Sequence, residues 1–204
     1  MDFNEADAAE VAEGGSLPRP KRADAQRNVV ALVDAAKTVF AEVGVDAPAK
    51  EITDLAGVGV GTLYRHFPKR SDLVAAVLEK EIDACVDLAE ELRSSHRPAE
   101  ALRTWVQRYA EFVGTKRGLA SALHSGDPAF DALADHFANR LEPAVAALLA
   151  AGSDDLRADV GATEVLHAIA LLCQRVPGKE LDYNRRLAGV FVDGLYRRAE
   201  DVAE

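Results

Sequence analysis

The chain has 204 residues, of which 49% are hydrophobic and 28% are charged, and its formal net charge is −10. This composition is typical of a globular chain with a sizeable core, and it excludes a protein that binds nucleic acid over its whole surface. Cys85 and Cys173 belong to no CxxC pattern, and the longest apolar run is too short to span a membrane. We therefore expect a cytoplasmic protein with reduced thiols.

The N-terminal region divides into an acidic tail and a basic arm. Residues 1–18 contain five acidic side chains and no basic one, and we expect them to be disordered. Residues 19–27, RPKRADAQR, carry four basic side chains against one acidic one. Only the contact face of a DNA-binding protein must be positive. For Arg19, Lys21 and Arg22, a solvated arm and a contact to DNA are equally compatible with this pattern.

Apolar residues at helical spacing predict an all-α fold. A first helix, 24–43, ends at Gly44, and two short helices follow at 49–56 and 60–67. In the second helix Ile52, Leu55 and Ala56 should face inward. A fourth helix, capped by Ser71, reaches about residue 92. The remaining predicted helices cover 98–117, 128–151 with a kink at Pro143, 157–174 and 183–201. Two all-α parts joined through the helix that starts at Ser71 are therefore expected.

The glycine-rich stretch GVGVGTLYRHF, residues 57–67, suggests close approach to phosphate. It is not a nucleotide loop, because the glycine spacing is wrong, no Lys-Ser/Thr pair follows, and the preceding segment is helical in pattern. A helix-turn-helix fits better. Gly57 ends its first helix, Val58 fills the core at the turn, and Leu63 and Phe67 face inward four residues apart.

The outward residues of the second short helix suit a DNA groove. Thr62, Tyr64 and His66 can donate hydrogen bonds to phosphates, and Val60 can touch thymine methyl groups. Gly61 costs about 1 kcal/mol relative to alanine in a helix. That cost is explained if a larger side chain would hold the helix away from DNA.

The segment ITDLAGVGVGTLYRHFPKRSDL, residues 52–73, follows a helix that ends in VFAEVG. Over residues 25–77 the chain resembles the DNA-binding domain of the TetR family of bacterial transcriptional regulators. The resemblance implies a three-helix DNA-binding domain at 19–70 and an effector-binding and dimerisation domain at 71–204. The DNA-contacting residues that it implies are Lys50, Gly59, Val60, Gly61, Thr62, Tyr64, Arg65, His66 and Arg70.

Some of these positions keep a second interpretation. Gly59 stands where the family often has Ser or Thr, so a side-chain cap and one phosphate contact are lost. Lys50 also fits a surface lysine, Tyr64 a packing aromatic, and Arg65 lies at a variable position that reaches a base or the backbone. Arg70 replaces a frequent lysine and should still bind phosphate.

The C-terminal part carries weaker signals. An aromatic stripe fits either a core or an apolar effector pocket, and His167 either a core histidine or a ligand contact. The pocket candidates are Trp105, Tyr109, Phe112, Phe137 and His167, with Phe130 near them. The last two helices resemble those that pair into a four-helix dimer interface, with Ile169, Leu187, Val190, Phe191 and Leu195 as candidates.

The predicted function is a homodimeric transcriptional regulator, most simply a repressor, that binds a palindromic operator and is released by a small molecule. No metal-ligand spacing and no catalytic constellation such as GxSxG is found, so we expect no enzyme, metal or cofactor. Two alternatives stay open. One is a helical small-molecule-binding protein or enzyme, and the other is an adaptor that has lost DNA binding, for which Gly59 and the net charge speak.

Overall fold

The computed structural model describes residues 20–119, 133–174 and 176–197, and these residues confirm the all-α fold class. Among them are eight helices and one isolated bridge, between Leu156 and Tyr196. The helices are α1 (Pro20–Glu42), α2 (Ala49–Ala56), α3 (Val60–His66), α4 (Arg70–Ser95), α5 (Pro98–Gly118), α7 (Leu133–Ala151), α8 (Ala162–Leu172) and α9 (Leu181–Asp193). The predicted acidic tail and Phe130 lie outside the described residues.

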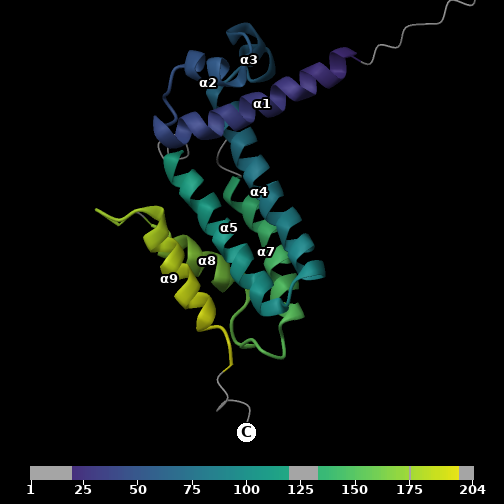
Figure 1. Cartoon of the computed structure of the whole chain (residues 1–204), viewed down its shortest axis with the longest axis vertical. Helices are drawn as coiled ribbons and strands as arrows, with labels where there is room; N and C mark the ends of the chain where they lie inside the picture. The colour runs from purple at the N-terminus through teal and green to yellow at the C-terminus, as the bar shows by residue number, and fades with distance from the viewer. Residues whose placement is uncertain (1–19, 120–132, 175, 198–204) are drawn as a thin grey trace, which may run out of the picture.

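Helices α1, α2 and α3 form one small unit at the N-terminal end of the molecule (Figure 1). Leu32 and Phe40 on α1 are buried together with Ile52 of α2 and with Leu63 and Phe67 around α3. Val58 at the turn packs against this core. The inward placement of Leu63 and Phe67 agrees with their spacing of four residues.

Leu55 corrects one prediction for α2. Its side chain is 58% exposed, whereas Ile52 and Thr53 are buried and Ala56 is half-buried. At 100° per residue, Leu55 lies about 110° away from the centre of that stripe. A helix of two turns buries only one narrow face, so an apolar residue on its flank stays in solvent.

The start of α4 corrects a second prediction. The helix begins at Arg70, and the carboxylate of Asp72 accepts a hydrogen bond of 2.9 Å from the backbone N–H of Lys69. Ser71 is therefore not the cap but a buried residue of the first turn. A carboxylate at the third helical position holds the helix start in the manner of a capping box.

Helix α4 runs from the N-terminal unit into the C-terminal bundle, where it lies beside α5 and α7 (Figure 1). It also packs on α1, so both parts of the molecule contact the same helix. Pro143 lies inside α7. Helices α8 and α9 lie beside α5 (Figure 1).

The ends of α8 and α9 differ from the predicted ones. Helix α8 starts at Ala162 rather than at 157, and α9 ends at Asp193, well before 201. The two segments beside these ends pair with each other instead. The N–H of Arg157 donates to the carbonyl of Leu195 over 2.8 Å, and the N–H of Arg197 donates to Asp155 over 2.9 Å. The spacing of apolar residues within one segment cannot predict such pairing between distant segments.

Candidate DNA-binding interface

The turn between α2 and α3 depends on Gly57. Its φ of 68° lies in the left-handed region, which L side chains adopt only with strain. The N–H of Gly57 donates to Asp54, and that of Val58 donates to Thr53 over 3.1 Å. These bonds satisfy carbonyls at the end of α2 and aim α3 across it.

Helix α3 exposes one of its faces to solvent. Val60, Gly61, Tyr64 and Arg65 are all exposed, Tyr64 by 55%. They follow the i, i+1, i+4, i+5 pattern of one helical face. Thr62 and His66 flank this face and are half-buried.

The two glycines at the start of α3 face open space. A Cβ built on Gly59 or on Gly61 would meet nothing within 4 Å. Gly59 is the extended N-cap, with a φ of −78° and no side-chain cap. Neither glycine is therefore needed for packing or for an unusual φ. The structure thus brings six of the predicted contact residues onto one helix and Gly59 to its cap, while contact with DNA itself stays a prediction.

Lys50 and Arg70 differ in how far they are free to meet a phosphate. The Nζ of Lys50 lies 2.5 Å from a carboxylate oxygen of Asp54, and both side chains are exposed. An exposed pair of this kind contributes little and can exchange partners. Arg70 lies over the ring of Phe40, with its guanidinium carbon 5.5 Å from the ring centroid, and donates to the carbonyl of Ala47. Arg70 therefore fastens α4 to α1 and to the loop before α2.

The predicted pocket aromatics lie together in the core of the C-terminal part. The rings of Trp105 and Tyr109 are 5.2 Å apart, those of Tyr109 and Phe112 5.9 Å, and those of Phe112 and Phe137 6.0 Å. All four are buried, and the Trp105 Nε1–H donates to the carbonyl of Cys85 over 2.8 Å. They are core residues in this structure, and a role in ligand binding stays a prediction.

The polar end of Tyr109 is held only weakly. Its hydroxyl lies 3.5 Å from the carbonyl of Leu166 on α8, at the limit of a hydrogen bond. Burial raises the pKa of this phenol, so it stays neutral. It is a donor within the core that a ligand could engage.

His167 does not belong to this cluster. It is exposed, whereas Val165, Leu166 and Ile169 form the buried side of α8. The interpretation of His167 as a core histidine is therefore wrong. Its position about 150° from the centre of the buried stripe places it on the outer face of α8.

The predicted dimer residues separate into two groups. Ile169 and Leu195 are buried within the chain itself, which leaves them no surface to offer a second copy. The interface prediction is corrected to exclude them, because they belong to the inner stripes of their segments. Leu187 and Phe191 are half-buried and Val190 is 68% exposed, so for these three the prediction stands.

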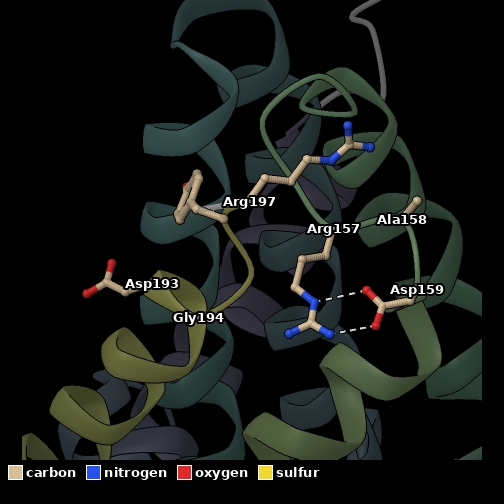
Figure 2. A pocket seen from close by; sticks show the side chains of 7 residues that line it. Arg157, Ala158, Asp159, Asp193, Gly194 and Arg197 are labelled. Atoms are coloured by element: carbon tan, nitrogen blue, oxygen red, sulfur yellow. Dashed lines mark hydrogen bonds and ion pairs between the residues drawn. The ribbon is translucent and has the colours of Figure 1, made fainter. Parts of the chain in front are cut away.

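An open polar groove of about 870 Å³ lies where residues 157–159 meet residues 193–197 (Figure 2). Arg157 binds both carboxylate oxygens of Asp159 at 2.9 and 2.6 Å, which lowers the pKa of that carboxyl. Asp193 pairs with Arg103, and the Nε of Arg197 donates to the carbonyl of Leu156. Charges that are paired in this way do not make an apolar effector site.

Within the described ranges, no three His, Cys, Asp or Glu side chains gather as a metal site would require. None of the helices in the described part of the chain is long and apolar enough to cross a membrane.

One buried charged residue was missed by the sequence analysis. Glu81 on α4 is only 3% exposed and binds Lys37 of α1 and Arg108 of α5. A signal was present, because Glu81 lies four residues after Val77 and four before Cys85, in the middle of the apolar stripe of α4. A carboxylate there must have cationic partners.

A tight helix-turn-helix with an open outer face, joined by one long helix to a helical bundle, defines the class of helix-turn-helix transcriptional regulators. Comparisons with known proteins narrow this class. Residues 32–77 match the model of bacterial regulatory proteins of the tetR family, and residues 97–197 match the C-terminal domain of SbtR-like transcriptional regulators. The chain belongs to the TetR family, and it is a transcriptional regulator with a DNA-binding helix-turn-helix.

Solved structures support the same assignment over most of the chain. A TetR regulator from Streptomyces coelicolor is 33% identical, covers 84% of this chain and 99% of its own, and superposes with a TM-score of 0.70. A second, from Mycobacterium vanbaalenii, is 32% identical with coverages of 87% and 100% and a TM-score of 0.70. A SmeT–triclosan complex, 16% identical with coverages of 84% and 92% and a TM-score of 0.58, shows the fold alone.

Curated relatives match over shorter stretches. An HTH-type transcriptional regulator of Staphylococcus aureus is 40% identical over 68 residues, which is 32% of this chain. The chain spans 35% of the length of that relative and 58% of another from the same species.

Proposed function

We propose that the protein is a homodimeric repressor that binds a palindromic operator through α3 and is released by a small molecule. The observation that carries the proposal is the outer face of α3. Gly61 is open there, Tyr64 and Arg65 point to solvent, and the turn at Gly57 holds the helix on a packed unit.

On DNA, the N-terminal end of α3 enters the major groove. Val60 and the methyl group of Thr62 face thymine methyl groups, while Tyr64 and His66 donate to phosphates. Lys50 on α2 exchanges Asp54 for a phosphate. Because the whole chain is acidic, Lys50 and the few other cations close to α3 must supply the electrostatic attraction to DNA.

The exposed apolar side chains of α8 and α9 support the homodimer. Leu171 on α8 is 69% exposed and Val190 on α9 is 68% exposed. A second copy of the same two helices would cover both side chains. To bind successive major grooves, such a two-fold pair must hold its two α3 helices about 34–36 Å apart.

Release from DNA requires an effector that binds more tightly to a dimer in which the two α3 helices are differently spaced. The aromatic cluster of α5 and α7 is the proposed site, with the weakly held Tyr109 hydroxyl as its polar group. The SmeT–triclosan complex is an example of the same fold with a small molecule. The effector class that this cluster favours is apolar or aromatic.

A gel-shift experiment with the DNA upstream of the protein's own gene tests the proposal. We expect binding of a palindrome, and a loss of about 10-fold or more in affinity for Thr62→Ala and for Tyr64→Ala, with unchanged folding. Thr104→Ala, an exposed threonine on α5, is the matched control and should bind normally. Failure to bind any palindrome there, or normal binding by both α3 variants, would contradict the proposal.

A further inference from the structure

A buried carboxylate joins the two parts of the molecule. The Oε1 of Glu81 lies 2.7 Å from the Nζ of Lys37 on α1, and its Oε2 lies 3.0 Å from Nη2 of Arg108 on α5. Lys37 belongs to the part matched by the tetR-family model and Arg108 to the part matched by the C-terminal model. Glu81 lies between these two matched segments and binds both.

Packing alone does not explain this arrangement. Burying the carboxylate of Glu81 costs several kcal/mol of desolvation, and an apolar residue of similar volume at such a site is often equally stable. The retained charges therefore suggest a role beyond stability. A second pair between α1 and α4, Asp34 with Lys80, is exposed and partly screened by water.

The ionic contacts continue from Arg108 to the end of the bundle that holds α9. Nη1 of Arg108 is buried, has no hydrogen-bond partner among the described residues, and lies 3.8 Å from Oε2 of Glu111. The other oxygen of Glu111 lies 2.6 Å from Nη2 of Arg185 on α9. Arg185 in turn binds Asp182 at 2.8 Å. Consecutive ionic contacts thus run from α9 to α1.

Arg108 has two carboxylates within reach and is hydrogen-bonded to one. One nitrogen of its planar fork binds Glu81, and the other stops short of a hydrogen bond to Glu111. Because the two oxygens of Glu81 bind Lys37 and Arg108, a shift of Arg108 on α5 acts on the same carboxylate that holds α1.

We propose that the Lys37–Glu81–Arg108 triad transmits the position of α5 to α1, and so to the DNA-binding unit. The triad residues are positioning residues, because none of them is placed against DNA or effector. This inference rests on the proposed function for its biological meaning. It adds the residues through which the C-terminal part would regulate DNA binding.

Hydrogen exchange of the full chain, without DNA or effector, tests this link directly. We expect Arg108→Met to speed exchange of the amides around Lys37 in α1 by roughly 2- to 30-fold, the range typical of coupled sites. In a Glu81→Gln background the same substitution should change α1 exchange by less than about 2-fold, because the link is already broken. Arg140→Met removes ion pairs between α7 and α4 and is the matched control. It should leave α1 unchanged.

A reciprocal substitution keeps the test decisive if Arg108→Met does not fold. Lys37 is partly exposed, so Lys37→Met should be tolerated, and it should speed exchange around Arg108 in α5. Lys80→Met removes the exposed pair with Asp34, which also joins α4 to α1, and it should not speed exchange in α5. Equal acceleration in every helix, or an Arg108→Met effect of the same size with and without Glu81, would overturn the proposal.

A DNA-binding measurement distinguishes a failure of this inference from a failure of the proposed function. With a duplex that the wild-type protein binds, Glu81→Gln should change the affinity by about 2-fold or more, while Arg140→Met should not. If no duplex binds, the proposed function fails, but the exchange experiment still decides whether the triad connects the two parts.

Discussion

At the scale of single residues, the open position of Gly61 allows stability and DNA binding to be separated. Gly61→Ala adds a methyl group that meets no other atom of the chain. We expect the free energy of unfolding to rise by about 0.5–1 kcal/mol, because glycine is unfavourable in a helix. DNA affinity should fall, because the methyl group would stand between α3 and the groove. Urea unfolding and a gel shift measure the two effects, and a rise in both quantities would show that α3 does not approach DNA at this point.

Cys85 leads to a prediction for alkaline pH. Burial raises the pKa of its thiol from 9.0 to about 12. Because the folded chain favours the neutral thiol, this contribution to stability is complete below pH 9 and is lost as the pH rises from 9 towards 12. The free energy of unfolding should fall by up to about 1.4 kcal/mol per pH unit in that window.

Denaturant unfolding between pH 8 and pH 11 measures this dependence. Cys85→Ala is less stable at every pH but should show a flatter decline above pH 9, since only the phenols of Tyr109 and Tyr196, whose pKa values burial also raises, then add to it. Parallel curves for the two proteins would contradict the assignment to Cys85.

At the scale of helices, Arg70 and Arg65 form a matched pair. Arg70 stacks on Phe40 and donates to Ala47, whereas Arg65 lies on the exposed face of α3. We expect Arg70→Ala to lower the stability of the N-terminal unit by about 1–2 kcal/mol without DNA. Arg65→Ala should change stability by less than about 0.5 kcal/mol but reduce the salt dependence of DNA binding. Thermal unfolding and salt titrations distinguish the two, and equal stability losses would refute the structural role of Arg70.

The short helices were predictable from the sequence, and the reason is local. Helix α2 has the predicted bounds because Pro48 and Gly57 flank it, and Gly57 has the φ that its turn requires. Leu63 and Phe67 are buried as their spacing predicts. For these elements, the residues that start and end a helix and the spacing of the apolar residues predict the same helix.

Features set by distant segments were not predictable in the same way. The ends of α8 and α9 depend on the pairing of Leu156 with Tyr196, which no local sequence pattern predicts. The predicted contact role of Arg70 came from a motif, which does not show that Phe40 lies beneath its guanidinium. For Glu81 the pattern shows a charge in an apolar stripe but not its partners, because Lys37 and Arg108 are brought to it by tertiary packing.

At the scale of the whole molecule, the proposed dimer makes α8 and α9 the surface to test. Val190→Glu places a charge where a second copy would bury an apolar side chain. We expect light scattering to give the mass of two chains for the wild-type protein and of one chain for the variant. Leu55→Glu changes a similarly exposed residue on α2 and should leave the mass unchanged. A wild-type monomer would contradict the dimer directly.

Footprinting on the bound upstream duplex shows whether two copies of α3 bind one operator. We expect two symmetric protected segments whose centres lie about 10–10.5 base pairs or a multiple apart, and their loss with Tyr64→Ala. A single unsymmetric footprint, or one that Tyr64→Ala leaves intact, would contradict two-fold binding through α3.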